Sequence, residues 1–211
     1  IPLRLVGSEM CIRDSVMHRL LTDNLLGVDK DQHAVRVACF SLYLAMCDEL
    51  EPRRYWTEVH FPTMRGERLI CSDFFEEKAG FRTPAAVGGD FEPHYDLILG
   101  NAPWGKGLLT ARALDWSVEP SNAWPVANKD IGCLFLAKSA RLLAPGGRLA
   151  MIQSAASLLF NQGEPAARFR RKLFSSHSVE AIYNLSALRF SMFGGKRHTP
   201  KVSAVSYTHL R

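Results

Sequence analysis

Hydrophobic residues along the chain fall into short continuous runs that alternate with longer stretches of mixed polarity. Short apolar runs bounded by turn-forming or acidic residues are typical of buried strands, and apolar residues three and four positions apart are typical of amphipathic helices. By these criteria the sequence predicts strands at 24–31, 68–76, 95–101, 147–154, 179–185 and 201–205, and helices at 32–50, 129–143 and 164–176.

Local signals mark the ends of the predicted helices. Asp31 precedes the first helix and can cap its N-terminus. An Ala-Pro-Gly-Gly stretch at 144–147 stops the second helix, and Pro165 lies near the start of the third. Residues 77–94 carry glycine, proline and charges and predict a loop, and residues 105–127 show no clear period.

Strands that alternate with helices predict an α/β fold with a mainly parallel sheet. In such sheets ligands bind at the carboxyl ends of the strands. The first three predicted strands lead into Asp29, Asp73 and Asn101, whose side chains all form hydrogen bonds. The sequence therefore predicts that these three residues lie along one edge of the sheet and line a common cleft.

The third predicted strand leads directly into Asn101-Ala102-Pro103-Trp104. Strands more often end in small polar turn residues. An amide and an indole side by side at the edge where ligands bind favour a binding or catalytic role. The alternative is an ordinary turn whose tryptophan belongs to the core.

Composition narrows the class of protein. The chain has 211 residues and 47% hydrophobic content, which suits one globular domain with a sizeable core. No apolar run reaches the roughly 18 residues that a membrane span needs, and no cleavable signal is recognised, so we expect a cytoplasmic protein without a membrane partner. The net charge of +5 permits nucleic-acid binding but does not argue for it.

The cysteines show no metal-binding spacing. Cys39, Cys47, Cys71 and Cys133 form no C-x-x-C pair and have no histidine at ligand spacing. We interpret them as reduced core residues and expect no metal site.

Both ends of the chain have an unusual sequence. Residues 4–15 and 205–211 resemble a translated sequencing-library adapter read in opposite orientations. We therefore interpret residues 1–15 and 205–211 as non-native, and residues 16–204 as an N-terminally truncated piece of a longer protein. We expect the two adapter-like segments to contribute little to the core.

Taken in order, the segments GVDKDQHAVRVA, ICSDFF, DLILGNAPW, CLFLAKSARLLAPGGRLAMI and FRRKLF with VEAIYNL resemble one family. They are similar to class I S-adenosylmethionine-dependent methyltransferases, and most closely to N6-adenine DNA methyltransferases of restriction-modification systems. The resemblance covers most of residues 16–204. It implies a Rossmann-like methyltransferase fold with helices on both faces of the sheet.

The resemblance assigns cofactor contacts to the first two strand ends. Asp29 would accept hydrogen bonds from the ribose hydroxyls of S-adenosylmethionine, and Lys30 would lie along the adenosine. Asp73 would accept a hydrogen bond from the cofactor's adenine amino group, and Phe74 would cover the adenine ring. The alternative interpretations are a helix cap at Asp29 and a turn aspartate followed by core phenylalanines at Asp73.

The same resemblance answers the question raised by Asn101-Ala102-Pro103-Trp104. The Asn101 side-chain oxygen and the Ala102 carbonyl would accept hydrogen bonds from the amino group of a flipped-out target adenine. Pro103 would fix the backbone and Trp104 would stack on the base. The family usually has proline where this chain has Ala102, which puts the rigidity of the loop in question.

Other features of the resemblance concern DNA and further segments of the protein. The family's Gly-rich first motif is not recognised in this sequence, and neither is a region that reads the DNA sequence. We therefore expect a target-recognition domain or a specificity subunit as a partner, and we expect this chain alone to be inactive. Methylation of RNA or of protein glutamine, and a non-catalytic DNA-binding domain, remain alternatives.

Three weaker expectations involve charged residues. Asp96, five residues before Asn101, matches a family pattern and is interpreted as a support for the catalytic loop. Arg168, Arg171 and Lys172 of the third predicted helix are candidates for phosphate contacts, with a solvated helix face as the alternative. A basic cluster at 196–198 is equally ambiguous.

Overall fold

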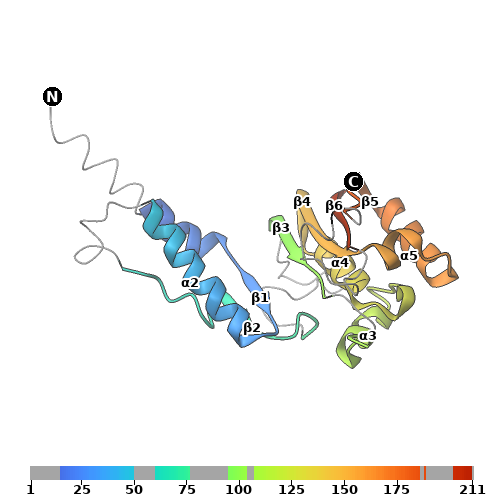
Figure 1. The fold of residues 1–211 in the computed structure, drawn as a ribbon, viewed down its shortest axis with the longest axis horizontal. Helices are drawn as coiled ribbons and strands as arrows, with labels where there is room; N and C mark the ends of the chain where they lie inside the picture. The colour runs from blue at the N-terminus through green and yellow to red at the C-terminus, as the bar shows by residue number, and fades with distance from the viewer. Residues whose placement is uncertain are drawn as a thin grey trace. The chain divides into compact units, whose positions relative to one another are not determined.

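The computed structural model describes residues 15–49, 60–76, 95–103, 107–185, 188 and 202–210, with the backbone alone for 157 and 202–210. The chain divides into two compact units, residues 1–76 and 77–211, and each unit is described by itself (Figure 1). Within the described residues, no helix is long and apolar enough to cross a membrane.

The first unit pairs two short parallel strands and covers them with helices. Residues 15–19 are helical and continue into the π-helix η1 (Leu20–Asn24), which leads to β1 (Gly27–Asp29). Helix α2 (Gln32–Asp48) connects β1 to β2 (Leu69–Cys71). The two strands pair in parallel, with Gly27 opposite Leu69 and Asp29 opposite Cys71, which gives the β-α-β arrangement that the sequence predicts.

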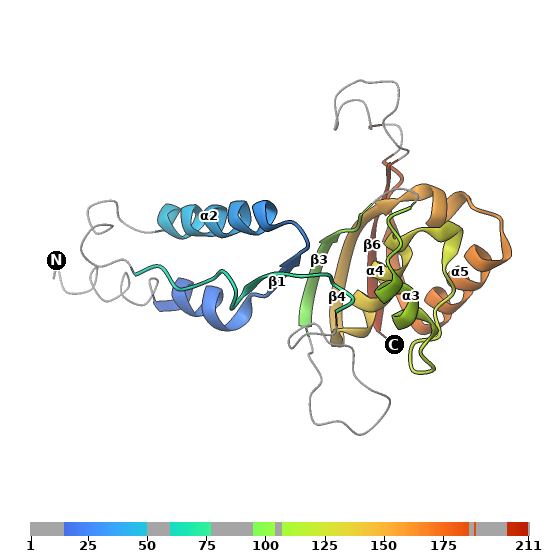
Figure 2. The same ribbon diagram turned by 90° about the horizontal axis from the view of Figure 1, so that it is seen from below.

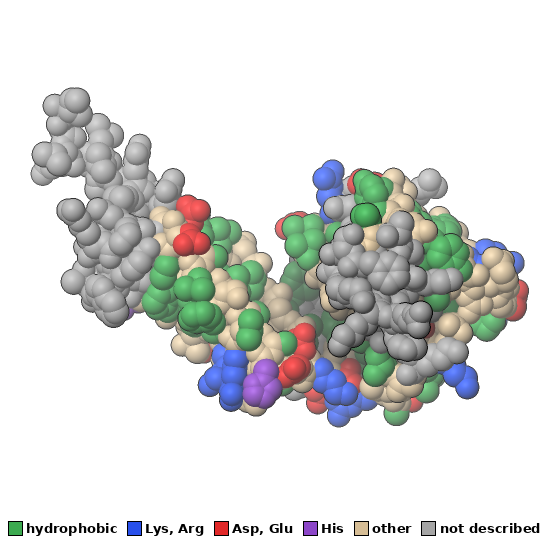
Figure 3. Space-filling model, in the orientation of Figure 1, with side chains coloured by type: hydrophobic (Ala, Val, Ile, Leu, Met, Phe, Trp, Pro, Cys, Tyr) green, Lys and Arg blue, Asp and Glu red, His purple; other side chains and the backbone are tan. Residues whose placement is uncertain are grey.

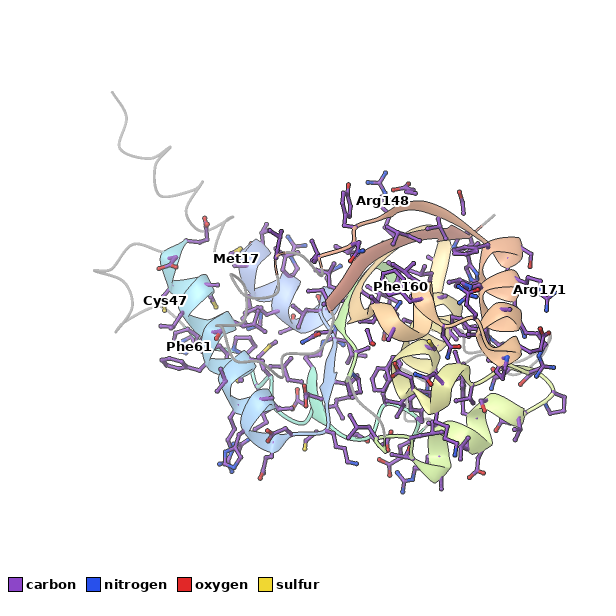
Figure 4. The ribbon with its side chains drawn as sticks, turned by 45° about the vertical axis from the view of Figure 1, so that its right-hand side comes forward. Met17, Cys47, Phe61, Arg148, Phe160 and Arg171 are labelled. Atoms are coloured by element: carbon purple, nitrogen blue, oxygen red, sulfur yellow. The ribbon has the colours of Figure 1, made fainter. Side chains whose placement is uncertain are left out.

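A small apolar core holds this unit together. Figure 4 shows Met17 on the first helix, where it packs with the buried cluster between that helix, α2 and β2. Asp31 caps α2 as predicted, because its side chain accepts a hydrogen bond from the His33 N–H at 2.7 Å. The buried members of the cluster are Leu21, Val35, Met46, Met64 and Leu69.

The second unit contains a four-stranded mixed sheet in the order β3-β4-β6-β5. Strands β3 (Tyr95–Asn101) and β4 (Leu143–Ser154) are parallel, whereas β6 (Val202–Leu210) runs antiparallel to both β4 and β5 (His177–Ile182). The helical segments between the strands are α3 (Ala111–Val118), η3 (Ala127–Lys129), α4 (Ile131–Arg141), η4 (Ala156–Phe160) and α5 (Glu164–Ser176).

Helix α4 forms the centre of this unit. Nine of its eleven residues are buried, which is unusual for a helix on the surface of a sheet. Asp130 caps the N-terminus of α4. Figure 2 shows α3, α4 and α5 on the same side of β3 and β4. On β3, Leu97 and Leu99 are 58% and 71% exposed.

Most predicted elements are confirmed, with differences at their ends. The strand at 95–101 and the helix at 164–176 have the predicted bounds. Helix α3 and the helix at 15–24 were not predicted. Strand β4 begins at Leu143, earlier than predicted, and crosses the Ala-Pro-Gly-Gly stretch through a register shift opposite β3. The interval 77–94 lies outside the described residues.

Strand β6 extends beyond the predicted 201–205 and includes the adapter-like residues 205–210. Backbone hydrogen bonds form a strand ladder with little regard to side-chain identity. Pairing with β4 and β5 therefore does not test whether these residues are native, and that interpretation stays a prediction. Residues 1–14 lie outside the described residues.

Candidate active site

The end of β3 presents Asn101 to solvent and buries Ala102. Asn101 lies opposite Ile152 of β4, and the Ala102 N–H donates to the Ile152 carbonyl at 3.0 Å. Successive residues of a strand point to opposite faces. Asn101 is therefore exposed, while Ala102 is only 2% exposed and is held against β4. An anchored backbone next to an exposed amide suits a side chain that must meet a ligand.

The remainder of this loop is described in part. Pro103 is half-buried, and Trp104 lies outside the described residues together with Gly105 and Lys106. The first turn of α4 lies against Ala102 and Pro103, because a Cβ atom built on Gly132 would lie within 4 Å of both residues. The role assigned to Trp104 stays a prediction.

Asp29 and Asp73 lie at the same edge of the β1–β2 sheet. The strands are parallel, Asp29 ends β1, and Asp73 comes two residues after the end of β2. The Ser72 N–H donates to the Asp29 carbonyl at 3.0 Å, which extends the pairing to the start of the turn. Two carboxylates at the carboxyl edge of adjacent parallel strands form the kind of site where ligands bind in α/β folds.

Each of these carboxylates uses one oxygen to hold its own turn. Asp29 Oδ1 accepts a hydrogen bond from the Asp31 N–H at 2.7 Å, and Asp73 Oδ1 accepts one from the Phe75 N–H at 2.9 Å. A carboxylate has a second oxygen with further acceptor capacity. The turn thus fixes each carboxylate while Oδ2 remains able to accept from a hydroxyl or an amine.

Lys30 and Phe74 flank these two carboxylates. Lys30 is exposed, and its backbone carbonyl accepts a hydrogen bond from the Cys71 thiol at 3.6 Å. Phe75 is 3% exposed and belongs to the core, whereas Phe74 is half-buried and packs edge-on against Phe75 at 5.6 Å. One phenylalanine of the pair is therefore structural, and the other is partly accessible beside Asp73.

An open groove of about 460 Å³ lies elsewhere in the first unit, between α2 and residues 61–65. Tyr43 closes one side, because its hydroxyl donates to the Pro62 carbonyl at 2.6 Å and its ring lies 4.9 Å from that of Phe61. Figure 3 shows hydrophobic side chains on the surface of the first unit, in the region where α2 lies in Figure 1. None of the sequence-predicted site residues lines the groove.

The interpretation of Asp96 as a support for the catalytic loop is wrong. Asp96 is the second residue of β3 and Asn101 is the last. A strand rises about 3.3 Å per residue, so the two residues are about 16 Å apart along an extended segment. Asp96 is exposed at the opposite end of the strand and cannot contact the loop.

Local contacts engage Lys172, one of the three candidate phosphate-binding residues on α5. Lys172 Nζ donates to the carbonyls of Asn122 and Ala123 at 2.6 and 3.0 Å and lies 4.6 Å from the centre of the Trp124 ring. Burial, and then the nearby Arg141, lower the pKa of Lys172. This lysine fastens α5 to the turn after α3, which is a structural role.

The other two cations of this set remain accessible. Arg171, which points outward from α5 in Figure 4, pairs with Glu164 at 2.7 Å, and both side chains are 68% exposed. Exposed pairs of this kind contribute about 0–1 kcal/mol, so a phosphate can replace Glu164 at little cost. Arg168 is exposed on the same helix. The structure thus supports a solvated face more than a built phosphate site.

The part of the chain that the structure describes contains no cluster of side chains that could bind a metal ion. There, His, Cys, Asp and Glu side chains do not gather in groups of three or more. Cys133 is buried in α4, and burial followed by the charge of Asp130 raises the pKa of its thiol. A thiol held neutral in this way is a core residue.

The parallel β-α-β pairing, with carboxylates after two strands and an exposed amide after a third, is consistent with a Rossmann-like methyltransferase fold. A family model described as "Eco57I restriction-modification methylase" matches residues 23–190. The chain belongs to this family. Its membership implies S-adenosylmethionine as the cofactor. The second carboxylate oxygens of Asp29 and Asp73 are chemically able to accept from hydroxyl and amino groups such as that molecule carries.

A solved structure supports the fold. The M protein of the type I restriction enzyme EcoKI matches with a TM-score of 0.50 and 16% identity, over 90% of this chain and 32% of that one. A TehB-like S-adenosylmethionine-dependent methyltransferase from Corynebacterium glutamicum matches with a TM-score of 0.34 and 12% identity, over 89% of this chain and 68% of that one. The PH0226 protein from Pyrococcus horikoshii matches with a TM-score of 0.38 and 10% identity, over 89% of this chain and 72% of that one. No curated protein matches the chain.

The length of the match limits what the comparisons assign. The chain spans about a third of the EcoKI M protein. Identity this low shows a shared fold, and function depends on the chemistry of the site. The substrate and partners of the whole protein are therefore argued from the residues themselves.

Proposed function

We propose that this chain is part of a DNA methyltransferase that transfers a methyl group from S-adenosylmethionine to N6 of adenine within a restriction-modification system. The observation that carries the proposal is the end of β3, where an exposed Asn101 precedes a backbone anchored to β4 by the 3.0 Å hydrogen bond of Ala102. Family membership supports the reaction type.

The amide of Asn101 addresses the main chemical difficulty of this reaction. The exocyclic nitrogen of adenine is a poor nucleophile because its lone pair is delocalised into the ring. Two acceptors directed at its two hydrogens localise that lone pair on nitrogen. They also stabilise the positive charge that develops as the nitrogen attacks the methyl carbon. In this proposal the Asn101 side-chain oxygen is one acceptor and the Ala102 carbonyl is the other.

The anchored backbone of Ala102 is what would make the two acceptors effective in stabilising the developing charge. Acceptors that are already in place when the charge develops need no reorganisation during the reaction. Ala102 is buried and bonded to β4, so a carbonyl at this position is held by the sheet although residue 102 is not proline. Pro103 restricts the next backbone torsion.

Reaching the target base requires DNA with the adenine flipped out of the duplex. Trp104 follows Pro103 and would stack on the extruded base, a contact worth about 1–3 kcal/mol. Sequence recognition would come from a target-recognition domain or a specificity subunit. A cytoplasmic location follows from the same proposal, because the chromosome is the substrate.

Four residues would hold the cofactor, which supplies the methyl group when bound. Asp29 would accept from the ribose hydroxyls with Lys30 along the adenosine. Asp73 would accept from the adenine amino group with Phe74 over the ring. Their placement after β1 and β2 supports this assignment, because both carboxylates lie at the carboxyl edge of one parallel pair.

Replacing Asp29 by alanine is expected to weaken S-adenosylmethionine binding by about 5–150-fold, which corresponds to about 1–3 kcal/mol of lost hydrogen bonds. Asp29→Asn should have an intermediate effect, since the amide oxygen still accepts from the Asp31 N–H but the charge is lost. Titration calorimetry with S-adenosylmethionine measures both. Asp48→Ala, at the far end of α2, is the control, and equal affinity of Asp29→Ala and wild type would contradict the assignment.

The substrate is tested by a methyl-transfer assay on adenine-containing duplex DNA, with RNA and protein substrates in parallel. The chain is assayed as it stands and together with the sequence that its gene encodes upstream. Labelled N6-methyladenine in DNA is the expected product. Transfer to RNA or to glutamine alone would leave the site chemistry intact and overturn the substrate. Cofactor binding without any transfer would favour a non-catalytic domain.

A further inference from the structure

The N-terminus of α4 packs against the backbone of the candidate catalytic loop. A Cβ atom built on Gly132 would lie 3.4 Å from the Pro103 carbonyl oxygen, 3.7 Å from the Ala102 Cβ and 3.2 Å from Asp130 Oδ1. These residues belong to the same unit and come from two elements about 30 positions apart in the sequence. Helix α4 therefore touches the loop at a point where no side chain separates them.

We propose that Gly132, held by Asp130, is a positioning residue that sets the Ala102–Pro103 backbone for methyl transfer, an inference that rests on the proposed function. β4 holds one side of the loop through the Ala102 N–H, and α4 holds the other through Gly132. Because residue 102 is alanine, its own φ angle is not locked by a ring. The loop geometry must then come from these two neighbours.

Asp130 makes the first turn of α4 a firm boundary. Its Oδ1 accepts a hydrogen bond from the Gly132 N–H at 2.9 Å, and the residue is 6% exposed. The capped turn lies at the start of a helix that is buried along most of its length, so it cannot retreat without disturbing the core. A side chain added at Gly132 would first meet Asp130 Oδ1 and then the Pro103 carbonyl oxygen, and of these two neighbours only the loop lies outside the packed helix.

The expected displacement is small but large enough to measure. A Cβ atom on Gly132 would press hardest on Asp130 Oδ1 at 3.2 Å and would meet the Pro103 carbonyl oxygen at 3.4 Å, the upper limit of a tight contact, so the loop would move by at most a few tenths of an ångström. Misplacement of a reacting group by about 1 Å costs about 10²-fold in rate, so Gly132→Ala should lower kcat by about 3–10-fold. Gly132→Val, with two more methyl groups, should lower it by about 100-fold.

Stability separates positioning from a purely structural role. Alanine is a better helix former than glycine and restricts the unfolded chain, so Gly132→Ala should leave Tm unchanged or raise it by about 1–4 °C. A glycine with only a structural role would show that change with an unaltered kcat. The proposal requires kcat to fall while Tm does not, with an unchanged affinity for S-adenosylmethionine.

A readout that needs no activity is exchange of the Ala102 amide proton, measured by NMR on the chain as it stands. Gly132→Ala should weaken the bond to the Ile152 carbonyl and speed this exchange by about 3–10-fold. Gly163→Ala is the matched control, because it adds a Cβ at the start of α5 where the nearest atom, at 3.1 Å, is the Asn161 Oδ1 of a side chain.

Faster Ala102 exchange in Gly132→Ala alone supports the proposal, and equal exchange in wild type and Gly132→Ala overturns it. Kinetics on adenine-containing DNA then distinguish the two levels of the argument. An active wild type whose kcat is unaffected by Gly132→Ala rejects the positioning role and leaves the proposed function standing. A wild type that never methylates adenine rejects the proposed function, while the exchange result still decides whether α4 positions the loop.

Discussion

Replacing Asn101 by alanine is expected to lower methyl transfer to adenine by about 10²–10³-fold and to leave S-adenosylmethionine affinity unchanged. The size follows from the loss of one preorganised group at a developing charge, by analogy with oxyanion-hole donors. Affinity for the cofactor should persist because the residues assigned to it, Asp29 and Asp73, follow other strands and have their own turn hydrogen bonds.

The experiment compares kcat on duplex DNA with the dissociation constant of S-adenosylmethionine measured by calorimetry. Asn101→Asp keeps an acceptor oxygen and should retain more activity than Asn101→Ala. Asn24→Ala is the matched control, because Asn24 is also exposed but precedes β1. Near-normal transfer by Asn101→Ala would show that the amide is not one of the two acceptors.

The Asn101 side chain is not expected to contribute to the folding of the second unit. Asn101 is exposed and contributes its backbone to the ladder with β4, and that contribution survives the change to alanine. A drop in activity with an unchanged Tm would therefore locate the effect in the chemistry.

The elements that the sequence predicts best are those whose signals are local. Strand β3 has the predicted bounds because a run of apolar residues ends at an amide and a proline, and a proline cannot continue the ladder. Helix α2 begins where Asp31 caps it, and α5 begins where Pro165 occupies its first turn. Each of these signals acts within four or five residues.

Helix α3 was missed because its signal is weak within the segment that surrounds it. Only Ala113, Trp116 and Ser117 are buried, and Thr110 supplies the cap by accepting from the Ala113 N–H at 3.2 Å. Prolines and glycines on either side suggest a loop when the whole interval is averaged. A search for Thr followed by a short apolar face would have found it.

Tertiary contacts account for what the sequence could not predict in the candidate site. Residue types at strand ends point to Asp29, Asp73 and Asn101 as candidates, and the structure places the first two at one edge of a parallel pair. The contact between Gly132 and the loop joins segments about 30 residues apart in the sequence, so no local sequence pattern predicts it. The misinterpretation of Asp96 has the opposite origin, because a motif spacing along an extended strand separates residues instead of joining them.

The structure also separates the roles of the basic residues on α5, which the sequence alone does not distinguish. Lys172 is drawn to two backbone carbonyls and to Trp124, so it contributes to folding. Through these contacts α5 holds the turn at Asn122 and Ala123.

Replacing Phe169 by alanine is expected to be strongly destabilising for the second unit. Phe169 is completely buried, and its ring lies 5.3 Å from that of Trp124. Removing a buried phenylalanine costs about 3–5 kcal/mol, because apolar contacts are lost and a cavity remains. A protein of this size has a total stability of about 5–15 kcal/mol, so the variant should lose a large share of it.

Denaturant unfolding followed by tryptophan fluorescence measures this loss, since Trp116 and Trp124 are both buried in this unit. In thermal unfolding followed by the same fluorescence, the expected decrease in Tm is about 6–20 °C. Phe174→Ala is the control on the same helix, because that side chain is 43% exposed and should cost less than about 1 kcal/mol. Equal stability of Phe169→Ala and wild type would show that α5 is not packed against Trp124. The first unit has its own core around Leu21 and Met46, so the change should weaken methyl transfer on warming before it weakens cofactor binding.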